Sequence, residues 1–186
     1  NSILEYDRRI QKGKNVVPRS SPPDLAIERE FYKLERIQIP KTNSFRVQGV
    51  PIGENEIKTG DIILMKVRIN APFEIPYVKV EAPLPSGAEV LSDQANIDTR
   101  SADSADGDFG YFNYWWTHQD ILDDRIVFFV TSMNSGKAEF QALLRMELPG
   151  QLNAYPVTFE GMYTKAVRGY STAAELKVVE ASMVGK

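Results

Sequence analysis

Several short segments of the chain alternate apolar and polar residues with a period of two, which predicts β-strands. In DIILMKVRIN, every second residue from Ile63 to Ile69 is apolar. KAEFQALLRMELPG keeps the same period from Ala138 to Leu148. Further strands are expected in YVKVEAP, YFNYWWTH, RIVFFVTSM and AELKVVEASMV. The pattern therefore predicts many short strands distributed along most of the chain.

The first patterned segment is LAIEREFYKLERIQIP, which begins at Leu25. As a strand it places Leu25, Ile27 and Phe31 on one side, with Tyr32 and Leu34 on the other. Its Glu, Arg and Leu residues also favour a helix. We expect a strand here and keep the helix as the alternative.

Two turns separate the predicted strands. LPSG (Leu84 to Gly87) suits a β-turn with Pro85 at position i+1 and Gly87 at i+3. NSG (Asn134 to Gly136) predicts a hairpin between RIVFFVTSM and KAEFQALLRMELPG. Seven or more short strands without helical crossovers predict an all-β fold, an antiparallel immunoglobulin-like β-sandwich.

Residues 1–24 are basic and end in a proline-rich run, PRSSPP, which breaks regular structure. We expect this segment to be a lead-in or linker from a preceding domain, and residues 25–186 to form the sandwich domain. The chain begins with Asn1 rather than Met. We therefore expect a fragment or processed product of a longer protein, whose targeting signal would be missing.

Composition narrows the possible functions. Of 186 residues, 42% are hydrophobic, which is enough for a core, and 22 basic against 25 acidic residues give a formal net charge of -3. This balance argues against nucleic-acid binding, which needs a clustered basic face. The absence of cysteine excludes disulfides, a thiol nucleophile and a zinc–thiolate site. A cysteine-free chain fits both the cytosol and many bacterial envelope proteins, so composition leaves the compartment open.

The one histidine, His118, lies near Asp120, Asp123 and Asp124 in WWTHQDILDDR. Histidine and carboxylates bind divalent metals, but a catalytic site usually needs at least three ligands on rigid elements. We expect these residues to lie on a loop after a strand. We favour a turn in which the Asp side chains accept backbone hydrogen bonds and pair with Arg125, and we expect no metal.

Two further segments allow a ligand. The acidic stretch DSADGDFG lacks the alternating oxygen ligands of a calcium loop, because Asp103, Asp106 and Asp108 break that spacing, so we expect an exposed loop. The aromatic run YFNYWW places Trp115 and Trp116 on opposite faces of a strand. Core and domain contact is the favoured role for this run, with sugar stacking as the alternative. No hydrolase elbow, phosphate loop or dinucleotide fingerprint is present, and nothing indicates an enzyme.

The stretch TFEGMYTKAVRGYS (Thr158 to Ser171) interrupts the strand pattern near the end of the chain. In order along the sequence, YVKVEAPLPSGAEV, THQDILDDRIVFF and this stretch resemble three segments of the last macroglobulin-like domain of bacterial alpha-2-macroglobulins. Those segments contain a D-x-L-P-A-G turn, an H-x-E-x-R-D-D-R-V run and an E-x-M-Y run. Upstream, IEREFYKL and KTGDIILMKVRI resemble the segment that leads into that domain. Ala82 and Gln119 depart from the family pattern, each standing where an acidic residue is usual.

The resemblance implies a macroglobulin-type β-sandwich that is one non-catalytic module of a protease-trapping protein. Such proteins carry an internal cysteine–glutamine thioester in a separate helical domain, which acylates a protease after bait cleavage. The family's M-Y pair packs over the thioester and excludes water, and it corresponds to Met162 and Tyr163. The implied partners are the thioester domain, the other domains of the parent chain and the target proteases, with no cofactor. The implied location is the cell envelope, periplasmic or membrane-anchored.

The hypothesis makes one expectation for the isolated chain: Met162 and Tyr163 are more exposed than is usual for their types. The first alternative is an immunoglobulin-like adhesion or carbohydrate-binding module that uses Trp115 and Trp116. The second is a metal-dependent hydrolase centred on His118.

Overall fold

The structure is a computed structural model that describes residues 20–38, 45–52, 56–91 and 117–181. The described part of the chain is built from β-strands. These are β1 (Ala26–Gln38), β2 (Phe45–Pro51), β3 (Ile57–Lys58), β4 (Ile62–Ala71), β5 (Ile75–Pro83), β6 (Ala88–Val90), β7 (Thr117–Ile121), β8 (Arg125–Met133), β9 (Gly136–Met146), β10 (Gly150–Ala154), β11 (Thr158–Gly161), β12 (Arg168–Tyr170) and β13 (Ala174–Val179). The segment that also allowed a helix is strand β1.

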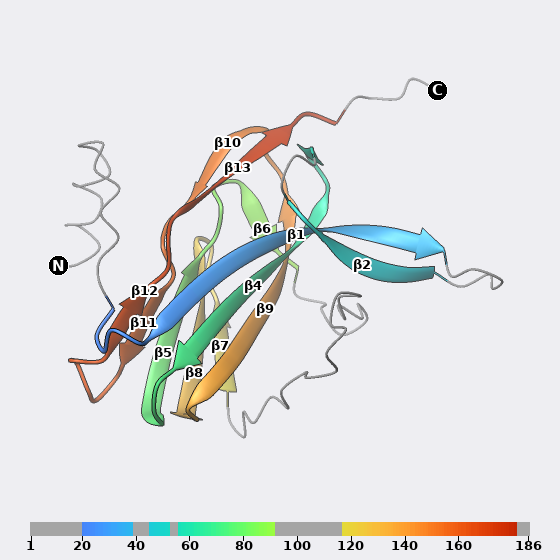
Figure 1. The fold of residues 1–186 in the computed structure, drawn as a ribbon. Coiled ribbons are helices and arrows are strands. Elements are labelled where there is room, and N and C mark those ends of the chain that lie inside the picture. The colour runs from blue at the N-terminus through green and yellow to red at the C-terminus, as the bar shows by residue number, and fades with distance from the viewer. Residues whose placement is uncertain (1–19, 39–44, 53–55, 92–116, 182–186) are drawn as a thin grey trace, which may run out of the picture.

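The strands form three sheets (Figure 1). The first sheet has the order β2-β1-β4-β9-β6, and the second has the order β12-β11-β5-β8-β7. A small third sheet, β10-β13-β3, extends the sandwich at one end. Neighbouring strands are antiparallel except for the two-residue pairing of β3 with β13, which is parallel. The predicted all-β antiparallel sandwich is confirmed.

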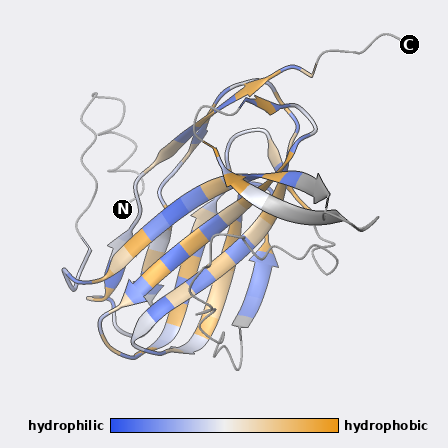
Figure 2. Cartoon of the chain, turned by 45° about the vertical axis from the view of Figure 1, so that its right-hand side comes forward, coloured by the Kyte–Doolittle hydropathy of each residue, from blue (hydrophilic) through white to orange (hydrophobic). Residues whose placement is uncertain are grey.

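The core lies between the first and second sheets, where the apolar residues of each alternating strand meet. Along β4, the residues at every second position from Ile63 to Ile69 are at most 1% exposed, and β5 contributes the fully buried Val78 and Val80. Figure 2 shows this alternation as bands of opposite hydropathy along the strands. Phe128 of the second sheet and Phe140 of the first sheet pack with ring centroids 4.8 Å apart. Burial of such side chains is the main favourable contribution to folding.

The predicted hairpin at NSG is wrong. β8 belongs to the second sheet and β9 to the first, so residues 134–135 cross between the sheets instead of joining paired strands. Gly136 has a φ of 104°, which glycine adopts without strain. A short polar connection between two alternating strands does not specify whether the second strand pairs beside the first or packs across the core, because both arrangements bury the same faces.

The LPSG turn is also displaced by one residue from its predicted register. The amide of Ala88 donates to the Pro85 carbonyl at 3.0 Å, so Pro85 is the first residue of the turn and Gly87 is at i+2. Gly87 has a φ of 75°, as a type II turn requires at i+2. A Cβ at this position would also lie 2.8 Å from Cβ of Leu148. Leu148 itself is 58% exposed and lies beyond β9, so the predicted apolar period overran the strand.

The outer face of the first sheet carries a cluster of charged side chains. Arg68 donates to Glu139 at 2.9 Å and to Glu30 at 2.5 Å, and the buried Lys66 ammonium lies 3.6 Å from Glu139. Burial by itself raises the pKa of Glu139. The hydrogen bonds from Arg68 and Gln141, together with the neighbouring cations, outweigh burial and hold this pKa below its ordinary value of 4.5.

Candidate functional site

Met162 and Tyr163 lie at the tip of the hairpin that joins β11 and β12, in the second sheet. Met162 is 45% exposed and Tyr163 is 77% exposed, although both side chains are large and apolar or aromatic. The tip closes on its own backbone, since Gly161 N donates to Val167 O at 2.9 Å and Val167 N to Thr164 O at 2.8 Å. This exposure agrees with the expectation from the sequence. The contact with a thioester domain stays a prediction.

Tyr77 of β5 lies beside this pair and was not singled out by the sequence. Its ring meets the Tyr163 ring edge to face, with centroids 5.1 Å apart and an interplanar angle of 89°. Its carbonyl accepts a hydrogen bond from the Met162 amide at 2.8 Å. Tyr77 is itself 48% exposed. Met162, Tyr163 and Tyr77 together form one exposed apolar surface, the aromatic tip.

The predicted network of Asp123, Asp124 and Arg125 is found only in part. Arg125 donates from Nε and Nη2 to the two carboxylate oxygens of Asp124, at 2.9 and 2.6 Å. These hydrogen bonds hold the pKa of Asp124 below its ordinary value and raise the pKa of Arg125. Arg125 Nη1 also lies 3.7 Å from Glu81, which the sequence did not suggest, whereas Asp123 takes no part in this ion pair.

The ion pair continues across the second sheet toward the aromatic tip. Lys79 Nζ lies 3.2 Å from Glu81 and 3.6 Å from Glu160 of β11. Asp124, Arg125, Glu81, Lys79 and Glu160 therefore form a continuous ion-pair ladder over β8, β5 and β11. It ends two residues before Met162. The ladder alternates three carboxylates with two cations, so each carboxylate in it lies beside a cation.

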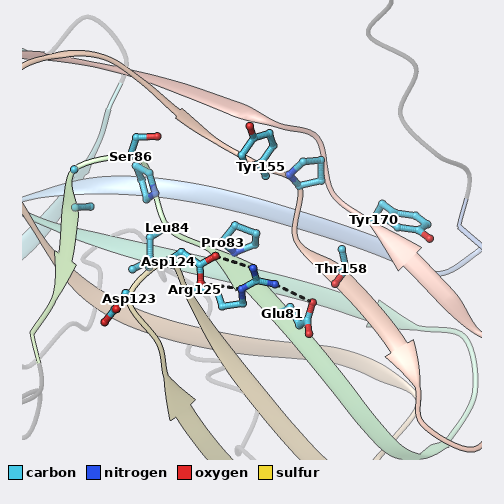
Figure 3. A pocket seen from close by; sticks show the side chains of 14 residues that line it. Glu81, Pro83, Leu84, Ser86, Asp123, Asp124, Arg125, Tyr155, Thr158 and Tyr170 are labelled. Atoms are coloured by element: carbon cyan, nitrogen blue, oxygen red, sulfur yellow. Dashed lines mark hydrogen bonds and ion pairs between the residues drawn. The ribbon is translucent and has the colours of Figure 1, made fainter. Parts of the chain in front are cut away.

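A pocket of about 440 Å³ lies at the other end of the ladder (Figure 3). It is lined by residues 83–88, 123–125 and 155–156 together with Glu81, Thr158 and Tyr170. The LPSG turn and the DDR hairpin meet here, since the Leu84 amide donates to the Asp124 carbonyl at 2.9 Å. In Figure 3 the Arg125 guanidinium lies between Asp124 and Glu81. Two segments that carry the family resemblance are thus brought together in space.

Arg29 of β1 fixes two walls of this pocket relative to each other. Its guanidinium donates to the carbonyl of Pro83 at 3.0 Å and to that of Ala154 at 2.9 Å. The amide of Ser86 adds a further bond to Asn153 O at 3.1 Å. These two charge-assisted bonds from one guanidinium hold the end of β5 and the end of β10 together. The sequence pattern of β1 did not predict this role for Arg29, because alternation assigns its position to the apolar core face.

His118 and Asp120 lie on strand β7, not on a loop as predicted, whereas Asp123 and Asp124 lie after that strand as expected. The His118 side chain is 74% exposed, its Nε2 lies 2.9 Å from Asp120 Oδ1, and the ring stacks on Phe129 at a centroid distance of 6.1 Å. Within residues 20–38, 45–52, 56–91 and 117–181, no group of three or more His, Asp or Glu side chains is placed to hold a metal ion. Trp115, Trp116 and the acidic stretch with Asp103 lie outside the described residues.

Solved structures of bacterial alpha-2-macroglobulins share this fold. The native conformation of the Escherichia coli protein matches with a TM-score of 0.66 and 21% identity over 89% of this chain and 10% of that chain. An Escherichia coli structure that spans domain MG7 to the C-terminus matches with a TM-score of 0.60 and 21% identity, over 83% of this chain and 23% of that chain. The same protein activated by porcine elastase matches with a TM-score of 0.62 and 22% identity, over 89% of this chain and 14% of that chain. The chain thus spans at most about a quarter of these relatives.

The sandwich and these matches define the chain as a macroglobulin-type β-sandwich module. It belongs to the family of bacterial alpha-2-macroglobulin MG10 domains, whose model matches residues 25–165. Comparison with curated proteins finds no match. The described part of the chain contains no helix long and apolar enough to cross a membrane.

Proposed function

We propose that this module docks on the thioester domain of its parent protein, excludes water from the thioester and moves away on activation. Met162 and Tyr163 are the contact residues. The main support for this proposal is that Met162 is 45% exposed and Tyr163 77% exposed, at a hairpin tip closed by its own backbone hydrogen bonds. Large apolar side chains held outward on an ordered segment are typical of surfaces that contact a partner.

The chemistry of the pair suits a removable cover. A methionine thioether adapts to irregular surfaces, and a tyrosine ring covers a large area with only two rotatable bonds. A modest apolar contact excludes water and still releases when the protein rearranges, whereas a buried ion pair requires the costly desolvation of both charges to form. The chain contains no cysteine, so the thioester would belong to another domain.

The wider assignment follows from the family. We propose that the parent is a protease-trapping alpha-2-macroglobulin in which this chain is the C-terminal macroglobulin-like module, without catalytic activity of its own. The match to an Escherichia coli structure running from domain MG7 to the C-terminus supports this position. A related protein activated by porcine elastase supports proteases as partners of the whole protein. We place the parent in the cell envelope, periplasmic or membrane-anchored.

The test is Tyr163→Ala in the full-length parent, followed by thiol release over time without methylamine or protease. Truncating an aromatic anchor at an interface commonly costs more than about 1 kcal/mol. This raises the population of the open state, and hence the rate of thioester loss, by about fivefold or more. Tyr155→Ala is the matched control, because Tyr155 is 51% exposed at the pocket and outside the aromatic tip. Equal rates in wild type and Tyr163→Ala would rule out the shielding role.

A further inference from the structure

Tyr77 has a backbone conformation that a tyrosine rarely adopts. Its φ is 50°, and it is the one residue other than glycine with positive φ among the residues that the structure describes. Positive φ is unfavourable for a bulky side chain, and such residues persist where the surrounding structure holds them. A glycine would occupy this position without strain. The presence of tyrosine here therefore indicates that the side chain is used.

The conformation of Tyr77 changes which side chains of β5 point outward. β5 pairs with β8 through Pro76–Ser132 and Val78–Val130, and the pairing skips Tyr77 between them. Pro76 and Tyr77 are consecutive and both exposed, so the strict alternation of β5 is broken at this point. Tyr77 shares the outer face with Lys79 and Glu81, and the break places Ile75, which is 1% exposed, in the core together with Val78.

Tyr77 contacts the hairpin tip through both its backbone and its ring. The carbonyl accepts from the Met162 amide at 2.8 Å, and the ring meets Tyr163 edge to face at 5.1 Å. Edge-to-face contact is a preferred geometry for aromatic pairs and limits the rotation of both rings. This contact holds the ring of Tyr163, a residue that is 77% exposed.

We propose that Tyr77 is the positioning residue of the aromatic tip, which holds Tyr163 in the orientation that contacts the thioester domain. This inference rests on the proposed function. The strained backbone of Tyr77 is a property of the free module, so the tip is oriented before docking and little ordering of side chains accompanies binding. Preorganisation of this kind strengthens a contact that buries little area.

The test measures thiol release from the full-length parent carrying four alternative changes: Tyr77→Gly, Tyr77→Phe, Tyr163→Ala and the double variant Tyr77→Gly/Tyr163→Ala. Glycine removes the ring while accepting the positive φ, so it separates the loss of the ring from backbone strain. Phenylalanine retains the ring. We expect Tyr77→Gly to raise the release rate about three- to tenfold, as loss of an aromatic pair predicts. Tyr77→Phe stays within about twofold of wild type, because the edge-to-face contact is retained.

The double variant distinguishes positioning from general destabilisation. If Tyr77 acts through Tyr163, the double variant releases thiol no faster than Tyr163→Ala alone. The positioning role would be overturned if the rate increases of the two single variants multiplied in the double variant. It would also be overturned if Tyr77→Gly lowered the melting temperature of the protein enough to account for its faster thiol release. A wild-type rate in Tyr77→Gly with a fast rate in Tyr163→Ala would overturn it too, and would leave the proposed function standing. A wild-type rate in Tyr163→Ala, or a parent without thioester, would remove the proposed function and this inference together.

Discussion

The hydroxyl of Ser171 joins the two segments that connect the small sheet to the second sheet. One segment runs from β10 to β11 and the other from β12 to β13. The Val157 amide donates to Ser171 Oγ at 2.9 Å, while the Ser171 amide donates to the Val157 carbonyl at 3.0 Å. Ser171 Oγ donates in turn to Thr172 O at 2.9 Å. Ser171 is 1% exposed and Val157 is fully buried, so water has no access to replace these bonds.

Ser171→Ala removes the acceptor of the Val157 amide and adds no new group. A buried donor left without its partner costs about 1–3 kcal/mol. We therefore expect the free energy of unfolding to fall by about 2 kcal/mol. For a domain of this size that corresponds to a fall of about 4–8 °C in the melting temperature. The hairpin that carries Met162 and Tyr163 lies between the two joined segments, so its support weakens as well.

The assay is urea unfolding of the 186-residue chain, with the slope against urea compared between variants to confirm that the same surface unfolds. Ser132→Ala is the control, because Ser132 Oγ donates to Glu74 at 2.7 Å on the exposed surface and its loss is expected to cost less than about 0.5 kcal/mol. If Ser171→Ala costs no more than Ser132→Ala, the hydrogen bond from the Val157 amide to the Ser171 hydroxyl does not stabilise the fold and the reasoning fails.

Two further changes test the fold. The pKa of Glu139 is depressed in the folded state, so its contribution to stability is complete above the ordinary pKa of 4.5 and is lost as pH falls through the lower folded value. Glu139→Gln should therefore flatten the fall in unfolding free energy below about pH 4.5, and urea titrations that keep the wild-type slope there would contradict this. A Cβ at Gly169 would lie 2.6 Å from Ile27 Cδ1 and 2.9 Å from Leu25 Cδ2. Gly169→Ala should cost about 1–2 kcal/mol through overpacking, and an unchanged urea midpoint would show that both side chains move without strain.

The candidate site was only partly visible in the sequence. Met162 and Tyr163 were identified through a family resemblance, since their spacing does not distinguish a strand end from an exposed tip. Tyr77 is 85 positions before Met162 and reaches it only because β5 and β11 pair in the second sheet. The positive φ of Tyr77 has no marker in the sequence, because glycine is the residue that usually announces such a conformation.

The sequence by itself determined the long alternating strands and which of their faces are buried. The alternation from Ile63 to Ile69, and the run that begins at Ala138, are local properties of the chain, and the structure keeps both. Strand partners are not local properties. The alternation of β9 is compatible with pairing beside β8 and with packing across the core from it, and only the assembled sandwich decides between them. For the same reason the ion-pair ladder, the pocket and the aromatic tip belong to the tertiary structure: each is made from strands far apart in sequence that pairing brings to one face.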